Sequence, residues 1–189
     1  WLEAQRILDV GARGRTRLGK GDAPAVRKLL PLINQGLRDA IAVVLPRVGP
    51  LLERLGWHDI EVVSMPVPGL TYRNDSSIPH LNRVQTREVG IKLEFHGKTL
   101  DRPQFFLNEA RLSALALAIY LAGRKVCAET LQADTPRLIV LDDVLIGLDQ
   151  SNRLPVIDLL ADQFQDWQVV LLTHDRVWFE MARAYQRRH

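Results

Sequence analysis

Two aliphatic runs in the last third of the sequence each end at side chains that could do chemistry. Asp142 and Asp143 follow one run, and His174, between Thr173 and Asp175, follows the other. Ligands of open parallel sheets bind beyond the carboxyl ends of the strands, so we expect these groups to converge at one rim. Adjacent carboxylates after a buried strand are costly to leave unpaired, and a divalent metal, its waters or a cationic substrate would relieve them. The alternative is that the acids cap the next helix and stay solvated.

The surrounding sequence predicts a parallel α/β layer that would position these groups. Residues 137–141 and 168–172 are continuous aliphatic runs, as is typical of strands buried on both faces. Helices are expected over residues 107–126, 151–164 and 175–185. Alternation of strand and helix in this order is typical of a parallel sheet with flanking helices.

Residues 22–56 have apolar side chains at three-to-four spacing, which predicts helix. Pro31, Pro46 and Pro50 predict that this helix is broken into two or three pieces. Gly56 is expected to end it.

A small antiparallel meander is expected after that helix. Ile60, Val62 and Val63 suggest a first strand, and residues 64–82 a loop or ragged hairpin. Residues 88–95 alternate apolar and polar side chains, which predicts a half-buried strand before a turn at residues 96–98.

Composition limits the class of protein. The 189 residues are 47% hydrophobic and 25% charged, which excludes a disordered tail, and 12 Gly and 10 Pro exclude a collagen-like chain. A formal net charge of +3 permits contact with nucleic acid without requiring it. The single cysteine, Cys127, excludes an internal disulfide framework, favours a reducing cytoplasmic setting and is expected to be buried. No apolar run approaches the roughly 18–20 residues that span a bilayer, so no membrane partner is expected.

Three segments together resemble an ABC-type ATPase. RLIVLDDVLIGLD at residues 137–149 is similar to a Walker B motif followed by a D-loop, and LLTHD at 171–175 resembles the switch-histidine segment. Upstream, FLNEARLSALALAIYLA at 106–122 resembles the signature loop and its helix. The order and the gaps are those of the SMC-like and RecF-like group, and the resemblance covers about residues 100–185.

The resemblance implies roles for four acidic and imidazole side chains. Asp142 would hold Mg²⁺ beside the nucleotide phosphates. Asp143 stands where most ABC ATPases have the glutamate that polarises the attacking water, and it is one methylene shorter. Asp149 would be the D-loop aspartate that reaches across a dimer interface, and His174 would sense the γ-phosphate.

The resemblance also implies that Asn108, Glu109 and Ala110 form the signature contact with the nucleotide. Asn108 stands at the usual serine position, and its amide can donate to a phosphate oxygen at a helix N-terminus. Ala110 stands at the usual glycine position, where alanine tolerates positive φ poorly. Simple capping of the helix is the alternative role for Asn108.

A working ATPase of this class also needs a Walker A loop. Residues 14–20 (GRTRLGK) match the glycine and lysine spacing, but Gly21 replaces the Mg²⁺-binding Ser or Thr and no aliphatic strand precedes the match. We therefore interpret residues 1–21 as the end of a coiled coil and a basic linker. Residues 22–189 are then a single domain, the C-terminal half of an ABC-type ATPase head whose Walker A lobe is absent from this sequence.

The function that the resemblance implies is hydrolysis of ATP with Mg²⁺ at a head–head dimer interface. The expected partners are the N-terminal Walker A lobe of the same protein, a second copy across ATP-sandwiched heads, and double-stranded DNA in repair, chromosome maintenance or defence against phage. The basic side chains are consistent with phosphate contact, although a solvated linker is an equal alternative. They are Arg13, Arg15, Arg17, Lys20, Arg27 and Lys28.

Two other functions stay open at this point. A degenerate lobe that holds nucleotide without hydrolysing it would serve as a binding module, as the departures at Asn108, Ala110 and Asp143 suggest. A metal-dependent nuclease is less favoured, because such sites need Asp-x-Asp spacing and a further Glu.

Overall fold

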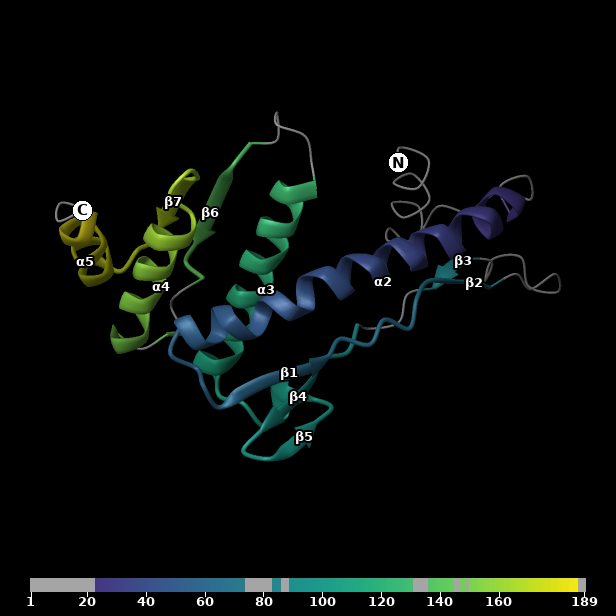
Figure 1. The fold of residues 1–189 in the computed structure, drawn as a ribbon, viewed down its shortest axis with the longest axis horizontal. Coiled ribbons are helices and arrows are strands. Elements are labelled where there is room, and N and C mark those ends of the chain that lie inside the picture. Colours follow the sequence, from purple (N-terminus) through teal and green to yellow (C-terminus); the bar gives the residue numbers. More distant parts are fainter. Residues whose placement is uncertain are drawn as a thin grey trace. The chain divides into compact units, whose positions relative to one another are not determined.

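A computed structural model gives the fold of the chain (Figure 1). It describes residues 23–73, 83–85, 89–130, 136–144, 147–148 and 150–186. The chain divides into two compact units, one of Trp1–Ala42 with Met65–Gly90 and one of Val43–Ser64 with Ile91–His189. The proposed linker over residues 1–21, with its Walker A-like match, lies outside the described residues, so the predicted boundary at residue 21 stays a prediction.

The smaller unit packs a helix against an extended segment. It contains the first part of α2 (Ala23–Arg54) and the antiparallel pair of β2 (Thr71–Arg73) with β3 (Arg83–Gln85). Val26 and Leu30, one helical turn apart, are buried against Leu29, Leu70 and Tyr72. Asn34 fixes the extended segment, because its amide accepts from the Leu70 N–H at 2.6 Å and donates to the Leu70 carbonyl at 2.9 Å.

The predicted division of residues 22–56 into pieces is wrong, since α2 is one helix through Pro31, Pro46 and Pro50. All three prolines are exposed to solvent. Water can therefore hydrate the carbonyls that lose their intrahelical donors, and the helix continues.

The end of α2 follows the prediction at Gly56. Gly56 has φ +84°, its N–H donates to the Glu53 carbonyl at 3.0 Å, and the Trp57 N–H donates to the Leu52 carbonyl at 2.9 Å. This pair of bonds around a left-handed residue is a Schellman motif, which glycine forms without a steric penalty.

The larger unit contains the expected three-stranded antiparallel sheet. Its strands β1 (Ile60–Ser64), β4 (Lys92–Phe95) and β5 (Lys98–Leu100) have the order β1-β4-β5. The strand predicted over residues 88–95 is shorter, because it begins at Lys92. His96 and Gly97, with φ of 49° and 71°, make the expected turn, since tight hairpins favour positive φ at both central residues.

The larger unit also contains the predicted parallel α/β layer, so the α/β class is confirmed. Strands β6 (Leu138–Asp142) and β7 (Gln168–Leu172) pair in parallel, with Ile139 opposite Val169 and Leu141 opposite Leu171. The short η2 (Pro103–Phe105) precedes α3 (Glu109–Thr130), α4 (Gln150–Gln163) lies between the strands in sequence, and α5 (Arg176–Gln186) follows β7. None of the described helices is long and apolar enough to cross a membrane.

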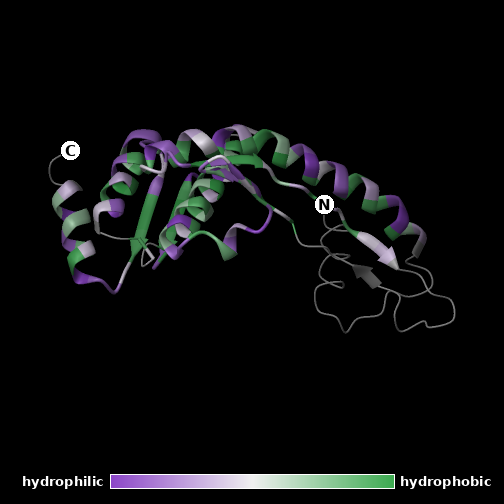
Figure 2. Ribbon diagram, turned by 90° about the horizontal axis from the view of Figure 1, so that it is seen from below, coloured by the Kyte–Doolittle hydropathy of each residue, from purple (hydrophilic) through white to green (hydrophobic). Residues whose placement is uncertain are grey.

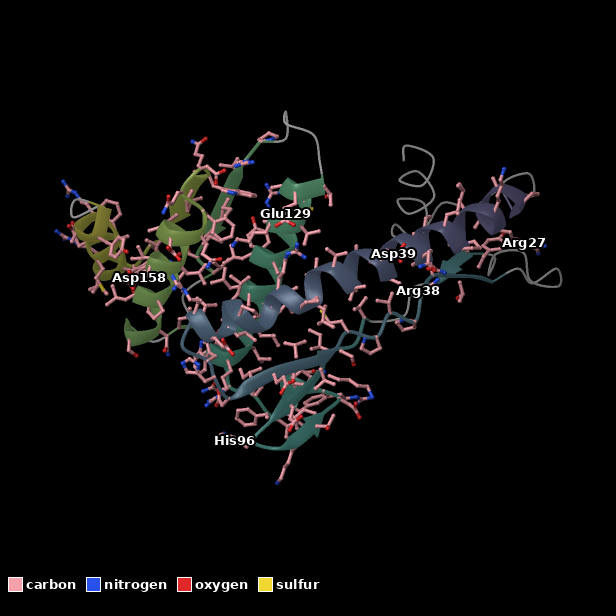
Figure 3. The ribbon with its side chains drawn as sticks, viewed as in Figure 1. Arg27, Arg38, Asp39, His96, Glu129 and Asp158 are labelled. Carbon is pink, nitrogen blue, oxygen red and sulfur yellow. The ribbon has the colours of Figure 1, made fainter. Side chains whose placement is uncertain are left out.

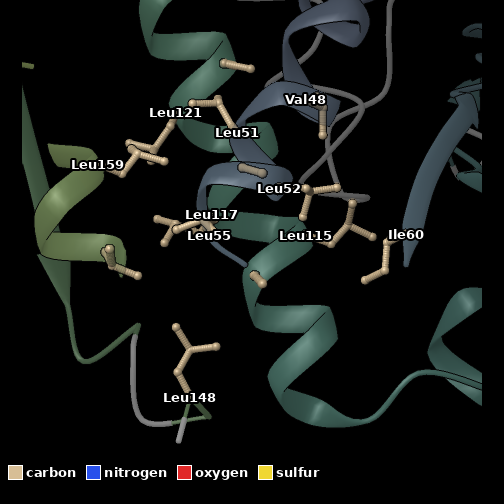
Figure 4. Packing of buried hydrophobic residues seen from close by; sticks show 14 of the residues in the cluster. Val48, Leu51, Leu52, Leu55, Ile60, Leu115, Leu117, Leu121, Leu148 and Leu159 are labelled. Carbon is tan, nitrogen blue, oxygen red and sulfur yellow. The ribbon is translucent and has the colours of Figure 1, made fainter. Parts of the chain in front are cut away.

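An alanine row on α3 forms the centre of the core of the larger unit. Ala110, Ala114, Ala118 and Ala122 recur every four residues and are all buried, so they lie in one ridge that a neighbouring helix can approach closely. Figure 4 shows leucines around this helix, which come from α2, the residue that follows it, α3 and α4. They are Leu51, Leu52, Leu55, Leu115, Leu117, Leu121 and Leu159, all buried.

Two small residues of α3 are exposed, and one of them, Cys127, was expected to be buried. Ala116 lies two positions from both Ala114 and Ala118, which on a helix of 3.6 residues per turn is the opposite side from the alanine row. Cys127 is also exposed, because it lies about 140° around the helix from Ala122.

Two glycine substitutions should have opposite effects on the stability of the larger unit. Gly56→Ala should lower the free energy of unfolding by about 1 kcal/mol, because alanine is strained at positive φ. Gly123→Ala, inside α3 with no atom within 4 Å of the added carbon, should raise it by about 1 kcal/mol. Urea denaturation of both variants checks the pair, and shifts of the same sign would contradict this account.

Candidate functional site

One face of the parallel pair is apolar and exposed. Along β6, Ile139 and Leu141 are buried, whereas Leu138 and Val140 are 37% and 45% exposed. On β7, Leu172 is 48% exposed. Figure 2 shows that both strands are largely hydrophobic along their length. Since parallel strands are normally covered on both faces, this face has the composition of a buried surface.

Asp142 lies at the end of β6, on the face shared with Leu138 and Val140. It pairs with Leu172 in the parallel register and is exposed. Within the described part of the chain its carboxylate has no hydrogen bond or ion pair with another side chain. Asp142 therefore presents free hard oxygen ligands at the carboxyl end of the strand.

Asp143 and His174 meet, as the predicted topology requires. The Asp143 N–H donates to the Leu172 carbonyl at 3.0 Å, which ties the end of β6 to that of β7. One Asp143 carboxylate oxygen accepts from the His174 backbone N–H at 3.2 Å, and the other lies 2.8 Å from His174 Nδ1. Asp143 has φ +50°, a backbone conformation uncommon for residues other than glycine.

The contact shifts both groups toward their charged forms. The hydrogen bond from the imidazole lowers the pKa of Asp143 below its ordinary value. The same bond, with the negative charge of the carboxylate, raises the pKa of His174. Because a carboxylate only accepts, Nδ1 must carry a hydrogen, which leaves Nε2 for a second partner. His174 is 71% exposed, so that partner can approach from solvent.

Hydrogen bonds on both sides fix the segment that carries His174. The Asp175 N–H donates to Thr173 Oγ1 at 3.1 Å. Asp175 Oδ1 caps α5 by accepting from the N–H groups of Val177 at 2.9 Å and Trp178 at 3.2 Å. An ion pair with Arg153 is the main cause that lowers the pKa of Asp175. Nothing in the sequence pattern indicated Arg153.

The segment proposed as a signature loop begins α3. Asn108 Oδ1 accepts from the Arg111 N–H at 3.0 Å, so Asn108 caps the helix, which leaves its amide N–H groups for another acceptor. Glu109 is exposed in the first turn. Ala110 is buried in the core and lacks positive φ, so alanine is unstrained there. Nucleotide contacts by these residues stay predictions.

Arg111 anchors the start of α3 to the antiparallel sheet. Its Nη2 lies 2.8 Å from the Asp59 carboxylate. Its guanidinium carbon lies 5.1 Å from the ring centroid of Trp57 and 5.2 Å from that of Phe95. These contacts join charge pairing with cation–π attraction. They depend on residues some 16 to 54 positions away in the sequence, so no local pattern could indicate them.

The loop after β6 lies against the start of α3. A Cβ on Gly147 would lie 2.7 Å from Ser113 Oγ and 3.1 Å from Glu109 Cγ, closer than real contacts allow. Only glycine fits without displacement of these side chains. The contact brings two of the predicted motifs together. Asp149, the proposed D-loop aspartate, lies outside the described residues.

A metal ion at this edge of the sheet would need ligands from a bound substrate as well as from the protein. Within the described ranges no group of three or more His, Cys, Asp or Glu residues could hold a metal ion. Mg²⁺ is usually bound by one or two carboxylates together with waters and substrate phosphates. Asp142 could make such a single-carboxylate contribution, and this role stays a prediction.

Comparison with known proteins gives a structural likeness only. No protein-family model and no curated protein match the sequence. An SMC head bound to the C-winged helix domain of ScpA is 16% identical over 74% of this chain, with a TM-score of 0.47. The Pyrococcus furiosus Smc head with an extended coiled coil is 13% identical over 85% of this chain (TM-score 0.48), and the Thermotoga maritima SMC head is 16% identical over 78% (TM-score 0.41).

The chain is structurally similar, at low sequence identity, to these SMC head domains. It spans 36%, 35% and 43% of the lengths of these three chains. A structure described as showing ATP-driven dimerization and DNA-stimulated activation of SMC ATPases is 16% identical over 77% of this chain and 76% of its own, with a TM-score of 0.47.

The Asp143–His174 contact predicts how the imidazole titrates. NMR should show a pKa for His174 above the ordinary value of about 6.5, and Asp143→Asn should lower it toward that value. Because the pKa of His174 is raised and that of Asp143 is lowered, the contact stabilises the fold from about pH 4 to above pH 6.5. This stabilisation is lost as the pH falls through the pKa of Asp143, and also as it rises through the pKa of His174. Identical His174 titration in both proteins would contradict the contact.

Proposed function

We propose that the chain is the C-terminal lobe of an ATPase head that binds and hydrolyses ATP with Mg²⁺. The observation that carries the proposal is the exposed Asp142, next in sequence to the Asp143–His174 pair, at the carboxyl ends of two parallel strands. This is the edge at which open α/β sheets bind ligands. The ordered motifs in the sequence indicate that this ligand is a nucleoside triphosphate.

Each group has a role that follows from its surroundings. Asp142 would hold Mg²⁺, which when bound supplies positive charge to neutralise the nucleotide phosphates. His174 can hydrogen-bond a phosphate oxygen through Nε2, because Nδ1 is occupied by Asp143. Asp143 orients the imidazole, and its carboxylate would polarise the attacking water.

The exposed sheet face supports a Walker A lobe as the first partner. Leu138, Val140 and Leu172 form an apolar surface on the side where Asp142 is exposed. A lobe that covers this face would bury it and bring a phosphate-binding loop to the same edge. A single proposed site would thereby be built from two lobes.

A second copy is the other protein partner that we propose. Asn108 and Glu109 are exposed at the start of α3, and Gly147 of the loop after β6 packs against Glu109 and Ser113. The helix N-terminus favours an anion, so this joint surface suits the phosphates of a nucleotide bound to another head. ATP would then lie between two heads. We propose that this dimer of heads acts in the cytoplasm.

Loss of the Asp142 carboxylate should abolish turnover. Asp142→Ala, in the chain completed by its Walker A lobe, should lower the Mg²⁺-dependent ATPase rate by about 100-fold or more. Asp166→Ala is the matched control, because Asp166 pairs with Arg137 at the opposite ends of the same strands. Wild-type turnover in Asp142→Ala would exclude the proposed role.

A non-hydrolysing module is the second candidate, and the geometry of Asp143 favours it. Both carboxylate oxygens accept hydrogen bonds from His174, so neither is reserved for a water. In that case ATP would drive dimerisation without release of phosphate. Sedimentation and phosphate release, measured on the same completed protein, separate the two candidates.

We propose double-stranded DNA as a further partner. Arg27 and Lys28 are exposed on the part of α2 in the smaller unit, where Figure 3 labels Arg27 and Arg38. Cations on one helix face can neutralise backbone phosphates without reading sequence.

Removal of Arg27 and Lys28 should reduce the salt dependence of DNA binding. If each contacts one phosphate, the double alanine variant should lower the slope of log K against log salt by about 1.8. Arg47→Ala with Arg54→Ala is the control, because these arginines are paired with Glu129 and Asp162 in the larger unit. An unchanged slope in the variant that lacks Arg27 and Lys28 would show that these residues do not contact DNA.

A further inference from the structure

Arg153 bridges two segments that flank the candidate site. Its Nε donates to the Leu148 carbonyl at 2.9 Å, and its Nη1 donates to the Asp175 carboxylate at 2.5 Å. The guanidinium carbon lies 5.9 Å from the ring centroid of Trp178. The Arg153 side chain is only 14% exposed, which makes it the most buried of the ion-paired basic side chains in the described part of the chain.

The two residues that Arg153 contacts lie in the two chain segments that carry Asp143 and His174. Leu148 is buried in the loop that follows Asp143, and Asp175 directly follows His174. Asp143 and His174 are themselves joined by two hydrogen bonds. The two segments are therefore tied twice, once by the Asp143–His174 pair and once by Arg153.

The chemistry of arginine suits this double contact. Its planar fork donates through Nε and Nη1 in fixed relative directions, and the same plane can stack on an aromatic ring. Lysine has the charge, but its three donors rotate on one flexible ammonium group, so it would hold Asp175 and the Leu148 carbonyl less rigidly.

From this geometry we infer that Arg153 is a positioning residue, which keeps the loop after β6 and the cap of α5 in the one arrangement that lets Asp143 hold the His174 imidazole. The inference concerns the same site as the proposed function and relies on it for any meaning in catalysis. The physical claim needs no nucleotide, because it concerns which nitrogen of His174 carries the proton in the protein alone.

The test is the tautomer of the neutral His174 ring, measured by ¹⁵N NMR on the full chain above the pH at which the ring titrates. The chain has five histidines, and the signals that vanish in His174→Gln identify this one. The wild-type protein should hold the hydrogen on Nδ1, facing Asp143. Asp143→Ala provides the reference for a ring without that acceptor.

Arg153→Ala should shift the tautomer of His174 from the wild-type form toward that of Asp143→Ala, and Arg153→Lys should restore it only in part. Arg54→Ala, which removes an exposed ion pair with Asp162, should leave the tautomer unchanged. A residue that serves stability alone would lower the melting temperature without this change at temperatures where the protein is folded.

The wild-type tautomer in folded Arg153→Ala would overturn the inference. If that variant does not fold, Arg153→Lys and Asp175→Asn decide the question, because asparagine can still cap α5 but lacks the charge that pairs with Arg153. Wild-type tautomers in both would overturn it equally.

Failure of the proposed function would look different. A completed protein that neither binds nor hydrolyses ATP would remove the proposed function, while the tautomer shift in Arg153→Ala would still hold. A normal ATPase together with an unchanged tautomer would retain the function and remove the inference.

Discussion

The parallel pairing of β6 with β7 is the constraint on which the candidate site depends. Its register sets Asp142 opposite Leu172, so the next residues on each strand leave the sheet at the same edge. A slip of one residue would turn Ile139 and Leu141 out of the core and move Asp142 to the other face. The hydrophobic core therefore fixes the positions of the polar groups, although none of those groups contributes to it.

The same pairing leaves one face of the two strands exposed. Two strands have one covered face, and the other face keeps the aliphatic composition of a buried surface. Asp142 is exposed on that face, which places the free carboxylate where a second layer would meet the sheet. An apolar surface and an exposed carboxylate on one face are the features that the proposed Walker A lobe would cover.

The sequence was sufficient for elements whose patterns are local. Aliphatic runs and helical periodicity located β6, β7, α4 and α5 to within one or two residues, and a parallel arrangement followed from their order. The prolines of α2 led to a wrong prediction of helix breaks, because the free-energy cost of a proline in a helix depends on whether solvent reaches the unpaired carbonyl. Arg111 and Arg153 were missed because their partners are distant in sequence and ordinary in type. The positive φ of Asp143 is also set by tertiary hydrogen bonds.

The aspartate at position 143 determines which group of the candidate site is held and which is left exposed. Asp143 accepts from both the backbone N–H and the ring of one residue, His174. The left-handed backbone at Asp143 turns the side chain toward that partner, at a cost that its bond to Leu172 helps to offset. In the proposed function, the oriented imidazole is therefore the group that would face an incoming phosphate.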